Sequence, residues 1–171
     1  MCSSDLCGIG VRGYISCVIE CPYEGRTDLV VVRDIVSQML DLGIQKIALG
    51  ETIGVAQQSD IQKLYEAIDG VLSPKDSILH LHNTKGTALE CAAEAMRCGV
   101  IRFDAACGGL GGCPYAPGAA GNIATEDLVD FAHQHGIETG IDLGKLINAS
   151  SIIERELQSP LQSAVYRASQ D

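Results

Sequence analysis

Two histidines near the middle of the chain have a spacing that suits metal chemistry. His80 and His82 are separated by one residue in an apolar stretch that predicts a β-strand, so both imidazole rings leave the same face of that strand. Imidazole nitrogens bind several divalent metals. The pair therefore indicates either a shared cation site at the carboxyl end of the strand, or one histidine hydrogen-bonded in the core and the other facing solvent.

A glycine-rich loop is the second feature that points to chemistry. It runs from Gly108 to Asn122 with six glycines in fifteen residues, so its backbone can approach a ligand closely. Cys113 lies in this loop directly before a proline, and we interpret it as a catalytic thiol, against the alternative of a small apolar filler. Asn122 ends the loop as either a turn residue or a third ligand. A mixed set of imidazole, amide and carboxylate ligands around an open position suits Mg²⁺ or Mn²⁺.

Two more residues are candidates for an active site. Glu51 follows an apolar strand, where a barrel strand presents a catalytic group, although a solvated loop carboxylate fits the sequence equally well. Tyr14 lies near the end of the first predicted strand, and its ring either faces the interior of a barrel or packs as core.

Alternating strands and helices must position these residues. Strands are predicted over residues 11–18, 46–49, 78–82 and 100–105, and helices over residues 27–43, 59–68, 87–98, 125–136 and 143–157. We expect Thr27 to cap the first helix, Ser59 and Gln62 to form a capping box on the second, and the polar tail after residue 157 to fray.

This order of elements predicts an α/β fold made of four βα units. Four units are either half of a (β/α)8 barrel or most of an open doubly wound sheet. The glycine loop follows the last strand and lacks the Gly-x-Gly-x-x-Gly spacing of a dinucleotide site, so half a barrel is favoured.

Composition limits the partners and the compartment. The chain has 171 residues and a net charge of −10, which disfavours nucleic acid and anionic membranes as partners. Neither a signal peptide nor a membrane-spanning run is apparent, so we expect a cytoplasmic protein whose eight cysteines are mostly reduced. The beginning of the chain resembles a translated sequencing adapter. We interpret residues 1–8 as an adapter or cloning artefact and residues 9–171 as a partial barrel domain.

From residue 9 onward the chain resembles hydroxymethylglutaryl-CoA lyase. The motifs that carry the resemblance, in the order of the family, are Val11-Arg-Gly-Tyr14, Cys17-x-x-x-Cys21-Pro-Tyr-Glu-Gly25, Leu49-Gly-Glu-Thr-Ile-Gly54, His80-x-His82-Asn-Thr84 and Gly109-Leu-Gly-Gly-Cys-Pro-Tyr-Ala116. Members of this family are complete eight-stranded barrels. The resemblance therefore implies a fragment containing strands five to eight of a TIM barrel and the carboxyl-terminal helices.

The resemblance also implies a reaction and a set of roles. The family carries out the metal-dependent retro-Claisen cleavage of 3-hydroxy-3-methylglutaryl-CoA to acetyl-CoA and acetoacetate, a step of leucine degradation and ketone body formation. By resemblance His80, His82 and Asn122 are the metal ligands, His80 also moves a proton, and Cys113 belongs to the active-site loop. Glu51 stands where the family usually has aspartate. The arginine-aspartate pair that ends the family's first strand has no counterpart here, so we expect the chain alone to be inactive.

Two other functions remain open at the level of sequence. Claisen-type synthases, resembling isopropylmalate or homocitrate synthase, share His-x-His-Asn but generally lack a cysteine in the loop, and Asn83 agrees with them better than with many lyases. The other alternative is a truncated, non-catalytic half-barrel. We also expect residues 11–18 and 100–105 to form open sheet edges, because the strands that would pair with them lie in the missing half of the barrel. Open edges favour association, for example into a homodimer.

Overall fold

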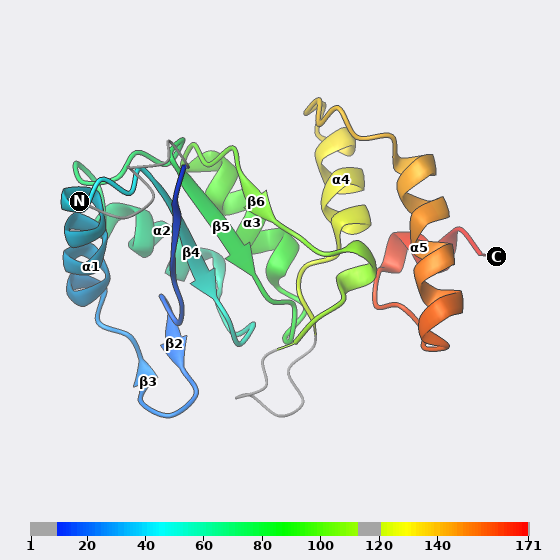
Figure 1. Cartoon of the computed structure of the whole chain (residues 1–171), viewed down its shortest axis with the longest axis horizontal. Coiled ribbons are helices and arrows are strands. Elements are labelled where there is room, and N and C mark those ends of the chain that lie inside the picture. The colour runs from blue at the N-terminus through cyan, green and yellow to red at the C-terminus, as the bar shows by residue number, and fades with distance from the viewer. Residues whose placement is uncertain (1–9, 113–120, 171) are drawn as a thin grey trace.

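A four-stranded parallel sheet forms the centre of the molecule. The computed structural model describes residues 10–112 and 121–170 (Figure 1). The strands stand in the order β1-β4-β5-β6, and every pairing among them is parallel. Their bounds are β1 (Arg12–Ile15), β4 (Lys46–Glu51), β5 (Ser77–Leu81) and β6 (Phe103–Asp104). The predicted parallel strands are confirmed, and the first and fourth lie at the two edges, as expected.

The fourth strand is shorter than the sequence predicts. Residues 100–102 belong instead to the connection from α3 (Ala88–Arg97), where the Val100 N–H donates to Ala95 O at 2.9 Å. The two residues of β6 are in register with β5, and the Leu79 N–H also donates to Arg102 O at 3.0 Å.

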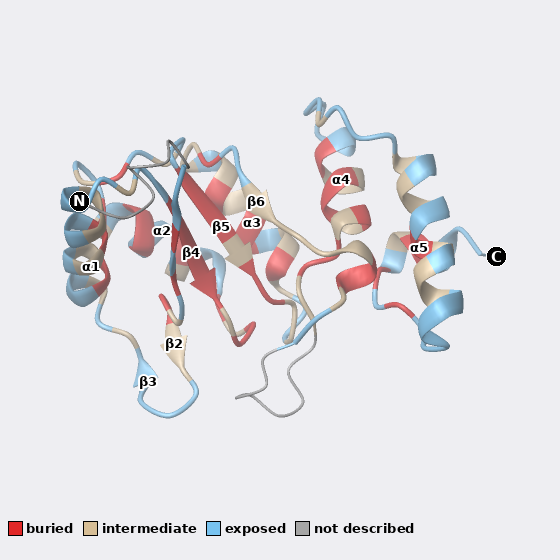
Figure 2. Cartoon of the chain, viewed as in Figure 1, coloured by how far each residue is buried: buried red, intermediate tan, exposed pale blue. Residues whose placement is uncertain are grey.

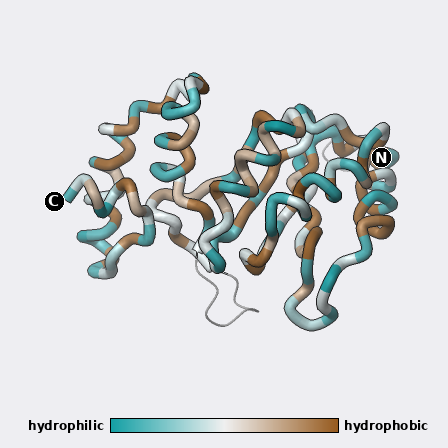
Figure 3. Tube along the Cα trace, turned by 180° about the vertical axis from the view of Figure 1, so that it is seen from behind, coloured by the Kyte–Doolittle hydropathy of each residue, from teal (hydrophilic) through white to brown (hydrophobic). Residues whose placement is uncertain are grey.

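Three helices cover one face of the sheet. They are α1 (Leu29–Asp41), α2 (Gln58–Ala67) and α3, and each follows one strand of the sheet (Figure 1). Seen from behind in Figure 3, hydrophobic residues recur along these helices between hydrophilic ones, as in amphipathic helices. The sheet buries Ile47, Leu49, Leu79 and Leu81 in the core, none more than 1% exposed (Figure 2).

Both predicted helix caps are wrong by one or two residues. Asp28, not Thr27, caps α1 and accepts a hydrogen bond from the Val30 N–H at 2.9 Å, while the Thr27 hydroxyl donates to Cys17 O. At α2 the capping pair is Gln57 and Asp60 in place of Ser59 and Gln62. In each case a carboxylate accepts a hydrogen bond from a backbone N–H at the helix start, where it lies near the positive end of the helix dipole.

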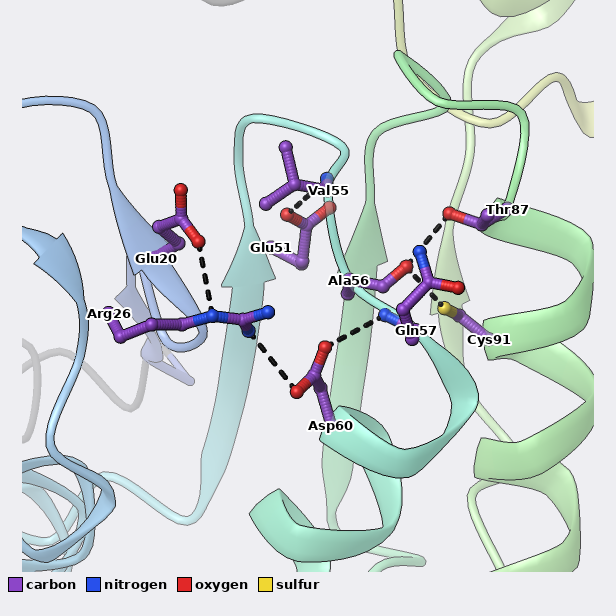
Figure 4. Close-up of polar contacts among 9 residues, drawn as sticks. All are labelled: Glu20, Arg26, Glu51, Val55, Ala56, Gln57, Asp60, Thr87 and Cys91. Carbon is purple, nitrogen blue, oxygen red and sulfur yellow. Dashed lines mark hydrogen bonds and ion pairs between the residues drawn. The ribbon is translucent and has the colours of Figure 1, made fainter.

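The segment between β1 and α1 forms a small hairpin. Strands β2 (Glu20–Cys21) and β3 (Gly25–Arg26) pair antiparallel around the turn that joins them. Arg26 forms ion pairs with Glu20 and with Asp60, both at 3.2 Å (Figure 4). The hairpin is thereby attached to the start of α2.

The carboxyl-terminal helices pack beside the sheet, beyond β6 (Figure 1). They are α4 (Thr125–Gln134), α5 (Leu143–Leu157) and α6 (Ala164–Ala168), with a short 3₁₀ turn, η2 (Cys107–Gly109), before the glycine loop. The expectation that the tail frays is wrong. Leu161 and Tyr166 are 2% and 1% exposed, and Asp127 of α4 accepts hydrogen bonds from Ser163, Ala164 and Val165 at the start of α6. Two apolar side chains and a fixed helix start offset the entropy of ordering the tail.

Several expectations lie beyond these observations. Residues 1–8 and Cys113 are outside the described residues, so the adapter interpretation and the role of the cysteine stay predictions. No helix in the described part of the chain is long and apolar enough to cross a membrane.

Candidate active site

The two histidines lie together at the carboxyl end of β5. Their ring centroids are 5.2 Å apart, and His82 is the residue that follows the strand. The His82 N–H donates to Glu51 O at 3.1 Å, which continues the pairing between β4 and β5 by one residue. The same-face prediction for His80 and His82 agrees with this geometry, while metal binding itself stays a prediction.

Asn122 lies on the segment beside this end of β5. An isolated antiparallel bridge joins His82 to Asn122, and the Ile123 N–H donates to Leu81 O at 2.9 Å. The Asn122 side-chain amide donates from Nδ2 to Leu110 O at 2.8 Å. This bond fixes the amide so that Oδ1 is buried, with no hydrogen-bond partner among the described residues. Buried polar atoms are normally satisfied, so this oxygen is suited to a ligand.

The three predicted ligands therefore fit a divalent cation of the Mg²⁺ or Mn²⁺ class. His80 and His82 offer imidazole nitrogens, and Asn122 offers an amide oxygen on the adjoining segment. Within the part of the chain that the structure describes, no three His, Cys, Asp or Glu side chains converge as metal ligands. A cation held here would therefore need the amide oxygen of Asn122 beside the two imidazoles, and this ligand set stays a prediction.

The face of the sheet opposite the helices carries a polar cluster that the sequence analysis missed in part. This open-face cluster consists of Arg12, Tyr14, His80 and Asp104. The Tyr14 hydroxyl donates to Asp104 Oδ2 at 3.0 Å, and the Arg12 guanidinium pairs with Asp104 and lies 4.7 Å from the Tyr14 ring centroid. Tyr14 is 54% exposed, so of its two predicted positions the structure shows the open face and not the core.

Asp104 connects this cluster to the candidate site. Its Oδ2 lies 3.8 Å from His80 Nδ1, and the two residues are in register across β5 and β6. Burial lowers the pKa of His80 below its ordinary value, although the Asp104 carboxylate acts in the opposite direction. Desolvation and the same carboxylate raise the pKa of Tyr14. The alternation of Arg12 and Tyr14 along β1 was the available sequence signal, but their contact with β6 depends on the sheet register.

Glu51 lies on the other face of the sheet. In the register of β4 and β5, Gly50 is opposite His80 and Glu51 is opposite the buried Leu81. The Glu51 side chain is 2% exposed, and its carboxylate accepts a hydrogen bond from the Val55 N–H at 3.0 Å (Figure 4). The solvated loop carboxylate is therefore excluded, and the structure does not bring Glu51 together with the open-face cluster.

The environment of Glu51 is made of backbone amides. Besides Val55, the amides of Gly54, Ala56 and His82 face the carboxylate and favour its ionised form. Burial outweighs them, and the net effect is to raise the pKa of Glu51. The side chain thus holds the loop after β4, while the main-chain oxygen of Glu51 accepts from the His82 N–H.

Comparison with known proteins agrees with this geometry. The model of the HMGL-like family matches residues 10–153. A mitochondrial hydroxymethylglutaryl-CoA lyase of Macaca fascicularis is 41% identical over 94% of this chain and 49% of its own length, and a hydroxymethylglutaryl-CoA lyase of Bacillus subtilis is 40% identical over 89% and 51%. The chain spans about half the length of the curated relatives that it matches.

Solved structures show the same fold. The crystal structure of the Bacillus subtilis HMG-CoA lyase superposes with a TM-score of 0.94 at 36% identity, over 98% of this chain and 56% of that one. An HMG-CoA lyase from Acinetobacter baumannii, in complex with coenzyme A and 3-methylmalate, gives 0.91 at 39% identity over 96% and 54%. The predicted half of a TIM barrel with carboxyl-terminal helices is confirmed. With the family match covering most of its length and the fold agreeing with solved lyases, this chain belongs to the HMGL-like family.

Proposed function

We propose that this chain carries the carboxyl-terminal half of an active site that cleaves 3-hydroxy-3-methylglutaryl-CoA to acetyl-CoA and acetoacetate, the reaction used in leucine degradation and ketone body formation. The observation that carries the proposal is the meeting of His80, His82 and Asn122 at one end of the sheet. The names of the relatives and the coenzyme A complex of one of them support the acyl-CoA substrate.

A divalent cation, Mg²⁺ or Mn²⁺, is the cofactor in this proposal. His80, His82 and Asn122 would hold it. When bound, it would make the tertiary hydroxyl of the substrate easier to deprotonate.

The side chains of this chain then move the protons. A base of the complete site removes the hydroxyl proton, and burial lowers the pKa of His80, which favours release of a proton from its ring. The C3 oxygen then becomes the ketone oxygen of acetoacetate as the C2–C3 bond breaks. The electron pair of that bond forms the enolate of acetyl-CoA. Cys113 or His80 returns a proton to the enolate carbon. Tyr14 lines the substrate side, and Glu51 acts as a positioning residue by holding the loop that follows β4.

The 171-residue chain by itself is expected to bind the cation weakly and to turn over no substrate. Its described residues supply three ligands, and β1 and β6 each pair with a single neighbouring strand. Unpaired edges favour association, so light scattering should report a homodimer or larger species. A stable monomer at high concentration would contradict this. A cytoplasmic location also stays a proposal, since the relatives include mitochondrial and cytoplasmic proteins.

The test is acetyl-CoA release from 3-hydroxy-3-methylglutaryl-CoA with excess Mg²⁺ or Mn²⁺. The chain is assayed alone and mixed with the separately expressed amino-terminal half of the Bacillus subtilis lyase. The expected result is turnover in the mixture that His80→Ala lowers by about 10³-fold. A mixture that forms a 1:1 complex by gel filtration yet stays inactive would overturn the proposal and favour the non-catalytic half-barrel. Turnover by the chain alone would contradict the expected inactivity.

The Claisen-type synthase is the second candidate, and Asn83 was the residue that favoured it. In the structure Asn83 Oδ1 accepts a hydrogen bond from the Ala88 N–H at 3.1 Å, at the start of α3. Its side chain therefore serves as a helix cap, so its identity says little about the substrate. Release of free coenzyme A from acetyl-CoA and a 2-oxo acid, in the same mixture, would favour the synthase.

A further inference from the structure

The tail that follows α5 lies directly against the start of the glycine loop. We refer to residues 159–168 as the strap. Leu161 of the strap is 2% exposed, and the Gln162 N–H donates to Gly108 O at 2.8 Å. A Cβ atom at Gly108 would lie 2.6 to 2.9 Å from atoms of the Leu161 side chain. Only glycine therefore fits at position 108 while the strap is in place.

The strap is itself held at both ends. Glu154 of α5 accepts hydrogen bonds from the Leu161 N–H at 3.0 Å and from the Tyr166 hydroxyl at 2.8 Å. Asp127 of α4 accepts from the Ser163 hydroxyl at 2.6 Å and from the Val165 N–H at 2.9 Å. These contacts fix the strap between two helices, so it can act as a rigid support.

The turn beneath the strap is fixed from its other side by a buried carboxylate. Glu126 is fully buried, and both of its oxygens accept from the Gly108 N–H at 2.9 Å. The Ser150 hydroxyl donates to the same carboxylate. Gly108 is thus held through its carbonyl by the strap and through its amide by Glu126.

The turn from Cys107 to Leu110 also contacts Asn122. Leu110 O accepts the hydrogen bond from Asn122 Nδ2, and a Cβ atom at Gly111 would lie 2.6 Å from that nitrogen. A Cβ atom at Gly109 would lie 3.2 Å from Asn122 O and 3.3 Å from Gln162 Cβ. The strap, the turn and Asn122 therefore pack so closely around Gly108, Gly109 and Gly111 that a Cβ atom at any of them would make a close contact.

We propose that the strap positions the side-chain amide of Asn122 through the turn from Cys107 to Leu110. Because Leu110 O takes the Nδ2 end of the amide, Oδ1 is the atom left for a ligand. Loss of the strap frees the turn, and the amide then rotates. The positioning of the amide stands on these contacts alone, whereas its importance for a cation rests on the proposed function.

The experiment compares matched variants of the 171-residue chain. Leu161→Ala loosens the strap, and Leu64→Ala removes an equally buried leucine from α2. Tyr166→Phe and Tyr65→Phe form a milder pair, since each removes one hydrogen-bonded hydroxyl, the first from a partly buried bond to Glu154 and the second from a buried bond to Ser77. The tyrosine pair decides the question if either alanine variant fails to fold.

The first readout is the Asn122 side-chain NH₂ signal in nitrogen-15 NMR, identified by its absence in Asn122→Asp. Strap variants are expected to move this signal toward that of a solvent-exposed asparagine and to speed exchange of the Gln162 amide, whereas the α2 variants leave both unchanged. The proposal is overturned if the Gln162 amide exchanges faster while the Asn122 signal stays in place. It is also overturned if the α2 variants shift the signal equally.

The second readout is Mn²⁺ binding followed by electron paramagnetic resonance. Strap variants are expected to bind Mn²⁺ about 10-fold more weakly than the unchanged chain, as is usual when the support of a ligand is lost. Asn122→Ala is measured beside them. If Asn122→Ala binds normally, the proposed cation site fails and the NMR result still decides the role of the strap. If only Asn122→Ala weakens binding, the strap does not support the ligand and the inference fails.

Discussion

His80 and Glu51 lie on neighbouring strands at the same end of the sheet, yet they belong to different parts of the molecule. His80 is on the open face with Arg12, Tyr14 and Asp104, whereas Glu51 is on the helix-covered face above the apolar core. The register places Gly50, not Glu51, opposite His80. A shift of one residue along a strand therefore separates a group that can reach substrate from one that holds the scaffold.

The largest effect that tests this comparison is on catalysis. His80→Ala in the mixture with the amino-terminal half should lower turnover by about 10³-fold, since general acid–base catalysis by a positioned side chain is worth about 10²- to 10⁴-fold. Glu51→Gln should lower turnover much less. Acetyl-CoA release at saturating substrate measures both. Equal losses in the two variants would show that the division between the faces does not separate chemistry from scaffold.

For stability, a substitution on the helix-covered face should have a larger effect than one on the open face. Glu51→Ala leaves the amides of the loop after β4 without their acceptor in a buried site, and should lower the free energy of unfolding by about 2 kcal/mol. Asp104→Ala removes a partly exposed ion pair and should cost less than about 1 kcal/mol. Urea unfolding of the 171-residue chain, followed by circular dichroism, measures both. A larger loss for Asp104→Ala would place the main support of the sheet on its open face.

The limits of sequence reasoning follow the same division. Helix α5 matches its predicted bounds because its apolar period and the Asp142 cap are local signals. The shared face of His80 and His82 could also be predicted locally, because side chains two residues apart in one strand leave the same face. The contact between Arg12 and Asp104 joins residues 92 positions apart and needs the strand order and register. Likewise the strap depends on Leu161 and Tyr166 reaching a surface made by α4 and η2, which no period in the tail indicates.

The pH dependence of stability should identify Glu51 as the buried carboxyl. Its pKa in the folded chain is raised above the ordinary value of 4.5, so the folded state binds its proton more tightly than the unfolded state does. Relative to Glu51→Gln, the unchanged chain should therefore lose stability as pH rises from about 4.5 through the raised pKa. The measurement is the difference in unfolding free energy between the two proteins from pH 4 to pH 8. If the unchanged chain instead became more stable than Glu51→Gln as the pH rises, the loop amides would lower the pKa of Glu51 more than burial raises it.

The smallest effect concerns a thiol on the helix-covered face. Cys91 of α3 is 1% exposed, its thiol lies 3.4 Å from Ala56 O (Figure 4), and burial raises its pKa to about 12. The reactive thiolate is therefore nearly absent at pH 8.5, and no reagent reaches the sulfur in the folded state. Iodoacetamide should leave Cys91 unmodified, as read by mass spectrometry of its peptide, until urea unfolds the chain. Because burial causes both barriers, raising the pH to 10 without urea should still give little labelling. Rapid modification under those conditions would mean that α3 separates locally from β5 and from the loop that carries Ala56, and the helix-covered face would then be as open as the face that carries His80.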